Sequence, residues 1–213
     1  MKIPVLIAGA SLVCALSSAA HAAAFSNGSF ETFVAADAYV TCLPGGIDFC
    51  GQYNAGNTGI TGWTIGGHSV DVVGFLGWKA ADGDWSIDLS GVGAGSLRQT
   101  FDTQAGTTYR VSFEIGGNFY GSSSVKTGTA SVGDTVLQLS FDDNGSSEAN
   151  MGWQSRSFDF TAAGPTSTLQ FVSGMDSANG LALDNVRVSA VPEPQTMALW
   201  LAGLAALSLR RRR

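Results

Sequence analysis

The sequence has little charge, and basic residues are especially few. Charged residues make up 13% of the 213 positions, and the C-terminus ends in four consecutive arginines. Residues 25–190 contain 16 acidic and six basic residues, so this part of the chain is acidic. Nucleic-acid binding needs clustered Lys and Arg side chains, and this distribution argues against it. Glycine is abundant, at 28 residues, a composition that favours strands and turns over helices.

Histidine and cysteine are also scarce, which restricts metal and nucleophile chemistry. His68 is the one histidine in residues 25–190, and no G-x-S-x-G motif is present, so a Ser-His-Asp hydrolase would depend on His68 alone. We interpret His68 as a polar turn residue. A zinc site needs about four ligands, more than Cys42, Cys50 and His68 supply. Cys42 and Cys50 instead enclose "CLPGGIDFC" and are predicted to form a disulfide outside the cytoplasm.

Both ends of the chain carry short hydrophobic runs. Lys2, the apolar residues 3–16 and the small residues that follow form the pattern of a secretory signal peptide; the alternative is a retained N-terminal anchor. Near the C-terminus, residues 197–209 are apolar. As a helix these 13 residues would cover roughly 20 Å, less than the ~30 Å of a bilayer's hydrocarbon core. We therefore divide the chain into a signal peptide (1–24), a body (25–190) and a C-terminal segment (191–213) that ends in a short hydrophobic helix.

The body shows the alternation of half-buried strands. In "YRVSFEI", Tyr109, Val111, Phe113 and Ile115 face one way and the polar residues between them face the other. Similar patterns, separated by Gly, Asn, Asp and Pro turn signals, predict strands at 69–74, 85–91, 96–103, 107–117, 134–142, 153–161, 167–173 and 181–189. Residues 32–62 are irregular and are predicted to be an insertion after the first strand. The expected fold is all-β, an antiparallel two-sheet sandwich or jelly roll.

In the C-terminal segment, Pro192, Glu193 and Pro194 are followed by the apolar run and four arginines. In this order of parts the segment resembles the PEP-CTERM sorting signal of exopolysaccharide-producing Gram-negative bacteria. The resemblance implies that an exosortase, a membrane protease-transpeptidase, removes the segment after export. Positive residues stay on the cytoplasmic side, so the segment would contact the inner membrane transiently. The protein would then reach the outer surface or the extracellular matrix. A short permanent anchor is the alternative.

Five motifs are distributed over the body: "NGSFE" (27–31), "SVDVVG" (69–74), "DGDWSIDLSG" (82–91), the 97–113 segment and "LALDNVRV" (181–188). Through these motifs the body resembles the choice-of-anchor C and DUF642-type domains, which look like galactose-binding jelly rolls. The segment around "CLPGGIDFC" departs from the family pattern. The resemblance implies that the first and last strands lie together and share a structural calcium. Carried over to this chain, Glu31 and Asp184 would supply carboxylate oxygens and Ser29 a backbone carbonyl. The alternative is that Glu31 and Asp184 only cap strand ends.

Exposed aromatic residues are the remaining candidates for a function. Sugar rings pack on aromatic rings, and amide and acid side chains bind their hydroxyls. The candidates for such a platform are Trp63, Trp78, Trp85, Phe119, Tyr120 and Trp153. We select Trp85, Tyr120 and Asn118 as ligand-binding residues, because they stand beside Gly and polar residues, and we expect Trp63 in the core. The predicted function is non-catalytic binding of an exopolysaccharide; the alternatives are a glycan hydrolase and a matrix protein without a ligand.

Overall fold

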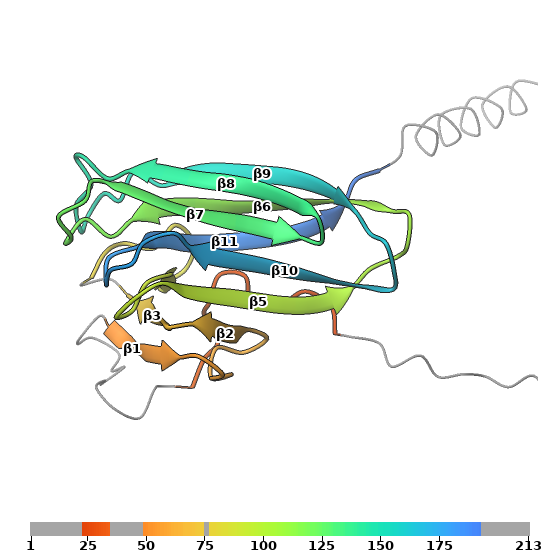
Figure 1. The fold of residues 1–213 in the computed structure, drawn as a ribbon, viewed down its shortest axis with the longest axis horizontal. Coiled ribbons are helices and arrows are strands. Elements are labelled where there is room, and N and C mark those ends of the chain that lie inside the picture. Colours follow the sequence, from red (N-terminus) through yellow and green to blue (C-terminus); the bar gives the residue numbers. More distant parts are fainter. Residues whose placement is uncertain (1–22, 35–48, 75–76, 193–213) are drawn as a thin grey trace, which may run out of the picture.

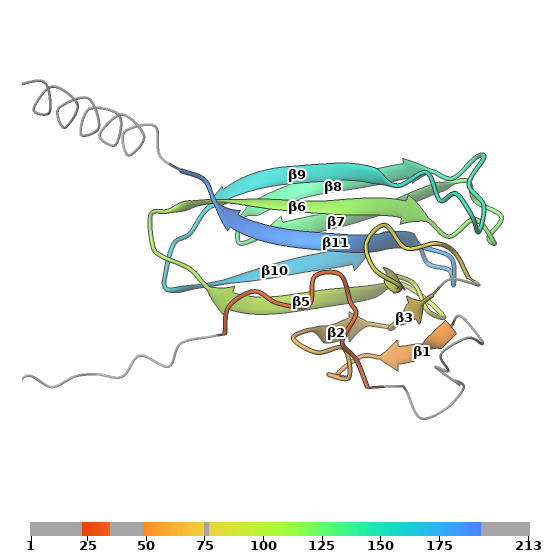
Figure 2. The same cartoon turned by 180° about the vertical axis from the view of Figure 1, so that it is seen from behind.

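The computed structural model describes residues 23–34, 49–74 and 77–192, which form two antiparallel β-sheets packed face to face (Figures 1 and 2). The six-stranded sheet contains, in spatial order, β1 (Phe49–Asn54), β3 (Ser69–Val73), β4 (Ser86–Asp88), β11 (Leu181–Ala190), β6 (Thr108–Gly117) and β9 (Gln154–Thr161). The five-stranded sheet contains β2 (Thr64–Gly67), β5 (Gly95–Asp102), β10 (Thr166–Ser173), β7 (Val125–Val132) and β8 (Thr135–Asp142).

The core lies between the two sheets and follows the alternation of the sequence. Val111, Phe113 and Ile115 of β6 point into it, and Leu169 and Phe171 of β10 meet them from the other sheet. The phenyl rings of Phe113 and Phe171 pack edge to face at 5.0 Å. This arrangement confirms the predicted all-β, two-sheet jelly-roll sandwich. In the part of the chain that the structure describes, no helix is long and apolar enough to cross a membrane.

The eight predicted strands correspond to β3–β6 and β8–β11, and three further strands were not predicted. β7 has no apolar alternation, because its inward positions are Lys126, Gly128, Ala130 and Val132. β2 has only four residues, two of them glycine. β1 lies inside residues 32–62, so the prediction of an irregular insertion is wrong for this part: β1 forms the edge of the six-stranded sheet.

The N-terminal segment docks on the last strand, although it is not itself a strand. The backbone N–H of Val186 in β11 donates to the carbonyl of Gly28 at 2.8 Å, and Phe33 forms an isolated bridge with Ile60. A Cβ on Gly28 would overlap the Val186 carbonyl, so only glycine allows this close approach. Phe30 and Trp63 pack together in the core, as expected for Trp63, and the Trp63 indole N–H donates to the Asn27 carbonyl at 2.9 Å.

Several predictions fall outside the described residues. These are the signal peptide up to residue 22, Cys42, the Glu193–Pro194 part of the sorting motif and the C-terminal helix. The disulfide between Cys42 and Cys50 therefore stays a prediction.

Candidate ligand-binding pocket

Two loops cover part of the outer face of the six-stranded sheet. The loop between β3 and β4, in yellow beside β11 in Figure 2, packs Trp78 on that face, and the loop between β8 and β9 adds Met151. With Val73 and Ala182 these side chains form a small hydrophobic cluster outside the main core. The indole N–H of Trp78 donates to the Ser86 hydroxyl at 2.8 Å, which satisfies its buried polar atom.

A pocket of about 390 Å³ lies between these loops and the sheet. Such a volume falls in the range of small-molecule sites, about 300–1,000 Å³. Its described lining comes from the β3–β4 loop, from β6, from the β8–β9 loop and from β11: Lys79, Ala80, Ala81, Glu114, Ala149, Asn150, Met151, Trp153 and Asn185. The lining therefore combines one aromatic ring with four polar or charged side chains.

Trp153 forms the aromatic part of the pocket, and its ring is held from two sides. A Cβ on Gly116 would lie 3.3 Å from the ring carbons, so the glycine lets the indole lie close to strand β6. The indole N–H donates to the Lys79 carbonyl at 2.9 Å, and the Lys79 N–H donates to the Glu148 carbonyl at 2.8 Å. The two loops that flank the pocket are thus tied together through Lys79.

Glu114 and Asn185 add polar groups from the sheet itself. The Ser155 hydroxyl donates to Glu114 Oε1 at 2.6 Å, which orients this carboxylate. Asn185 lies at a β-bulge, where the register of β11 against β6 shifts between Asp184 and Arg187. Its φ of 50° is in the left-handed region, which asparagine tolerates better than most residues. Bulges redirect side chains, and here the redirected side chain lines the pocket.

Two carboxylates hold the loop that forms one wall of the pocket. Oδ2 of Asp184 accepts the N–H groups of Ala81 and Asp82 at 2.7 and 2.9 Å, and Oδ1 accepts that of Asn185 at 2.6 Å. Oε1 of Glu31 accepts the N–H groups of Asp84 and Trp85 at 2.9 and 3.0 Å. Burial raises the pKa of Asp184 to about 7, although the hydrogen bonds that Asp184 itself accepts lower this pKa.

These contacts bear directly on the predicted calcium. Three of the four carboxylate oxygens of Glu31 and Asp184 accept backbone N–H groups, whose positive hydrogens are unsuitable neighbours for a cation. Among the described residues, no group of three or more His, Cys, Asp and Glu side chains is placed to hold a metal ion. The donor set in this arrangement does not fit calcium at these oxygens, and the site at Ser29, Glu31 and Asp184 stays a prediction.

A second pair of acids, Asp71 and Asp88, lies farther along the same outer face. The two residues are direct cross-strand partners on β3 and β4. Burial, with the charge of Asp88 as a smaller cause, raises the pKa of Asp71 to about 8. Burial likewise raises the pKa of Asp88 to about 7, although Asp88 accepts hydrogen bonds from Asn118 at 2.6 Å, Ser90 at 2.8 Å and Gly180 at 3.1 Å. This carboxylate joins three separate loops at their bases.

The three residues that we selected as ligand-binding have different surroundings, although the Tyr120 N–H donates to Asn118 Oδ1 at 3.1 Å. Trp85 is half-buried and packs edge to face on Phe33 at 5.3 Å, so it is not the exposed ring that we expected. Asn118 is buried, and its amide donates to Asp88. Tyr120 is 57% exposed, and its hydroxyl donates to Glu148 at 2.9 Å. Of the three, Tyr120 is the exposed side chain, and its hydroxyl contacts the β8–β9 loop that flanks the pocket.

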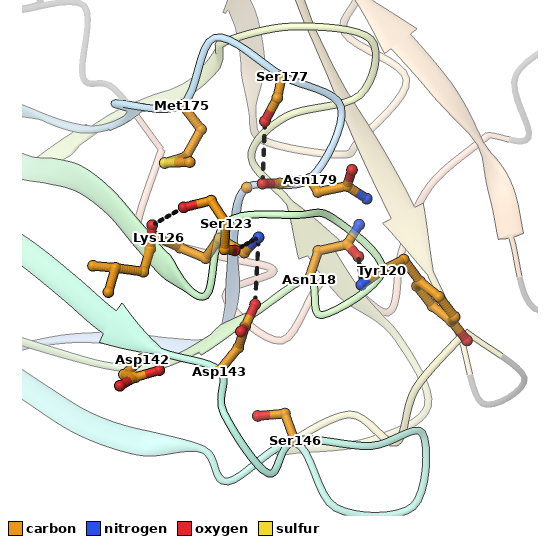
Figure 3. A network of polar contacts seen from close by, with 12 residues as sticks. Asn118, Tyr120, Ser123, Lys126, Asp142, Asp143, Ser146, Met175, Ser177 and Asn179 are labelled. Atoms are coloured by element: carbon orange, nitrogen blue, oxygen red, sulfur yellow. Dashed lines mark hydrogen bonds and ion pairs between the residues drawn. The ribbon is translucent and has the colours of Figure 1, made fainter.

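Figure 3 shows why the loop that carries Asn118 and Tyr120 is well anchored. Lys126, 1% exposed, donates to the Ser123 carbonyl and lies 3.3 Å from Asp143 Oδ2. The Tyr120 ring points away from this buried ion pair. A buried charge is tolerated only when it is paired, so this contact fixes the base of the loop and leaves the ring outside.

Sequence reasoning missed most of the pocket. Trp153 was among the aromatic candidates but was not selected, and Lys79, Glu114, Asn150 and Asn185 were not considered. Their common feature, a position on the outer face of one sheet or in a loop that crosses it, exists only in the folded chain. One local signal was available: an asparagine directly after Asp184 in a strand is a candidate for a left-handed residue at a bulge.

Fold and pocket together define a β-sandwich with a polar, aromatic-lined pocket on the outside of one sheet. The chain belongs to the family described as "Protein of unknown function (DUF642)", which matches residues 23–189. Residues 190–213 match the PEP-CTERM protein-sorting motif, which implies export and sorting. Both resemblances found in the sequence are thereby confirmed.

Individual relatives cover this chain to different extents. Halomucin of Haloquadratum walsbyi (strain DSM 16790 / HBSQ001) is 30% identical over 197 residues, which are 89% of this chain and 2% of halomucin. This chain thus spans a very small part of that relative. Similar solved structures include TmCBM61 in complex with beta-1,4-galactotriose (16% identity, TM-score 0.46, 62% of this chain and 90% of that chain). Another is CBM35 from Paenibacillus barcinonensis (18% identity, TM-score 0.43, 66% of this chain and 99% of that chain).

Proposed function

We propose that this protein is an exported, non-catalytic module that binds a polysaccharide in the pocket beside Trp153. The observation that carries this proposal is the combination of an indole ring with Glu114, Asn150 and Asn185 around one pocket. The flat C–H face of a sugar packs on an aromatic ring, while carboxylate and amide groups bind its hydroxyls. The ring of Tyr120 is exposed, and its hydroxyl donates to Glu148 of the β8–β9 loop, which flanks the pocket. This ring would extend the contact with the sugar beyond the pocket.

The pocket favours binding over hydrolysis. Glycosidases use two carboxyl groups at a set separation of about 5–10 Å across the scissile bond. Glu114 is the one carboxylate among the described residues that line this pocket. Asp71 and Asp88, the acids with strongly raised pKa values on the same face, are not part of its lining.

Polysaccharide isolated from the producing bacterium is the direct probe of this function. We expect wild type to be retained on the immobilised polymer and Trp153→Ala to bind about tenfold more weakly or worse, because the variant loses its stacking surface. Tyr120→Ala should weaken binding less. Gln138→Ala, an exposed change on the other sheet, is the control, and urea midpoints establish that each variant is folded. No retention of wild type would instead favour a matrix protein without a ligand.

The sorting motif leads to a second part of the proposal. An exosortase would remove the C-terminal segment after a transient stay in the inner membrane, and the body would reach the outer surface or extracellular matrix. Mature protein from the native cell should then lack the residues that follow Pro194 and should be absent from the inner membrane at steady state. Intact mass spectrometry checks this directly, since retention of Arg213 would show a permanent anchor.

A further inference from the structure

We infer that Glu31 and Asp184 are positioning residues of the pocket, whose carboxylates hold the 79–85 segment by accepting its backbone N–H groups without a metal ion. This inference rests on the proposed function in one respect, namely that the pocket binds a ligand. The holding contacts themselves are a property of the fold.

The first argument is the pattern of donors. Four N–H groups, from Ala81, Asp82, Asp84 and Trp85, point at two carboxylates from distant parts of the chain. Gly83, between the two pairs, has φ 69°, and a Cβ at this position would overlap the Glu31 carboxylate. A turn that directs successive N–H groups at anions is a typical anion-binding concavity. Here the anions are supplied by the protein itself.

The second argument is the connection from these contacts to the pocket. The held segment includes Lys79, Ala80 and Ala81, which line the pocket. Lys79 also accepts the indole N–H of Trp153 through its carbonyl. Release of the segment would therefore displace one wall of the pocket and remove the hydrogen bond that orients its aromatic ring.

The third argument is the origin of the two acids. Asp184 lies at the bulge of β11, and Glu31 follows Gly28, which accepts a hydrogen bond from Val186 at the same bulge. The N-terminal segment thus brings Glu31 to the pocket loop only when it is docked on β11. Pocket shape and docking of the N-terminal segment are coupled through one side chain.

Glu31 and Asp184 accept their hydrogen bonds differently, and this difference distinguishes the holding role that we infer from a role in binding calcium. Glu31 accepts both N–H groups with one oxygen, so the carbonyl of a glutamine can take over. Asp184 accepts with both oxygens, so an asparagine would turn its amide NH₂ toward a backbone N–H. Glu31→Gln should therefore behave nearly as wild type, whereas Asp184→Asn should not. A calcium ligand would be impaired by both changes, because each removes a charge.

Hydrogen exchange of the labelled full chain measures the holding contacts without any ligand. In Glu31→Ala we expect the amides of Asp84 and Trp85 to exchange about tenfold faster or more, because the carboxylate that accepts them is lost. The indole N–H signal of Trp153 should also shift. Glu31→Gln should restore slow exchange, and Asp134→Ala, in the exposed β7–β8 turn, should have no effect. Wild type should exchange equally slowly with calcium and with excess chelator.

Two results would overturn the inference. The first is fast exchange in Glu31→Gln equal to that in Glu31→Ala. The second is fast exchange of wild type in chelator, which would identify the residues as calcium ligands. Binding to the bacterial polysaccharide is measured separately, and Glu31→Ala should lose affinity while Glu31→Gln keeps it. If wild type does not bind the polymer, the proposed function fails, and the exchange rates still decide whether the carboxylates hold the loop.

Discussion

The two sheets of this sandwich share one core but have very different outer faces. On the six-stranded sheet, outward side chains such as Ser86, Asp88 and Asp184 are buried, because loops cross above them. On the five-stranded sheet, outward side chains such as Thr127, Gln138 and Ser140 are exposed, and Thr100 and Thr168 bond to each other in the open. In Figure 1 the five-stranded sheet is in front, and in Figure 2 the six-stranded sheet is in front.

This difference between the outer faces shows that the choice of residue at some surface positions is constrained by contacts other than core packing. An outward position on the five-stranded sheet needs only a side chain that tolerates water and a strand. An outward position that lies under a covering loop on the six-stranded sheet must also satisfy the backbone of that loop, since a buried polar group without a partner is costly. On the uncovered part of this sheet, Arg110 and Asp159 are exposed and pair with each other. Acids at these positions bind loops to the sheet, and the pocket lies among those loops.

The largest expected effect comes from exchanging acids for alanine on the covered face. Asp88→Ala would leave three buried donors, from Asn118, Ser90 and Gly180, without their acceptor. We expect a loss of about 3 kcal/mol or more in the free energy of unfolding, because each such donor costs about 1–3 kcal/mol. Gln138→Ala on the open face should stay within about 0.5 kcal/mol of wild type. Equal urea midpoints for the two variants would remove the distinction between the faces.

A pH titration tests the same face without mutation. The pKa values of Asp71 and Asp88 are raised from 3.8 to about 8 and about 7, so the folded protein keeps protons that the unfolded chain has released. Their contribution to stability is complete below the unfolded pKa and is lost as the pH rises through 7 and 8. The free energy of unfolding should fall between about pH 4 and pH 8 and level off above pH 8. The slope should be about 1.4 kcal/mol per pH unit for each acid that is protonated only in the folded chain.

The control for this titration is Asp71→Asn, which cannot release a proton and should make the slope smaller, since Asp88 still titrates. Urea midpoints measured across this pH range give the answer for both proteins. Stability that rises with pH would contradict the assignment of raised pKa values to this face.

The smallest effect separates two glycines with positive φ. Gly133, in the β7–β8 turn, has φ 56° and open space where an added methyl group would lie, so Gly133→Ala should cost about 1 kcal/mol from backbone strain alone. Gly83 has φ 69°, and its added methyl group would also meet Glu31. Gly83→Ala should cost about twice as much, and thermal melting compares the two. Identical losses would show that the Glu31 contact does not constrain the loop.

Much of the fold was predictable because strands carry their burial pattern in the local sequence. Tyr109–Ile115 alternates in sequence as it does in burial, and the turns contain Gly, Asn and Pro. The strands that escaped prediction carry no such pattern. β7 places Lys126 in the interior, which is possible only because Asp143 approaches from the β8–β9 loop. The placement of β1 at a sheet edge depends on its pairing with β3, about 20 residues farther along the chain.

The sequence by itself determined the all-β class, eight of the eleven strands that the structure describes, the family and the sorting motif, because these are written in short contiguous patterns. It also identified Glu31 and Asp184 as a pair, through the resemblance of their motifs. Only the tertiary structure decided what the pair touches, which aromatic ring lies in the pocket and which is packed away. The reason is physical: the residues next to Trp85 and those next to Trp153 in the sequence are similarly polar. The exposure of each ring depends on a distant residue, since Phe33 packs on Trp85 and the Lys79 carbonyl accepts the indole N–H of Trp153.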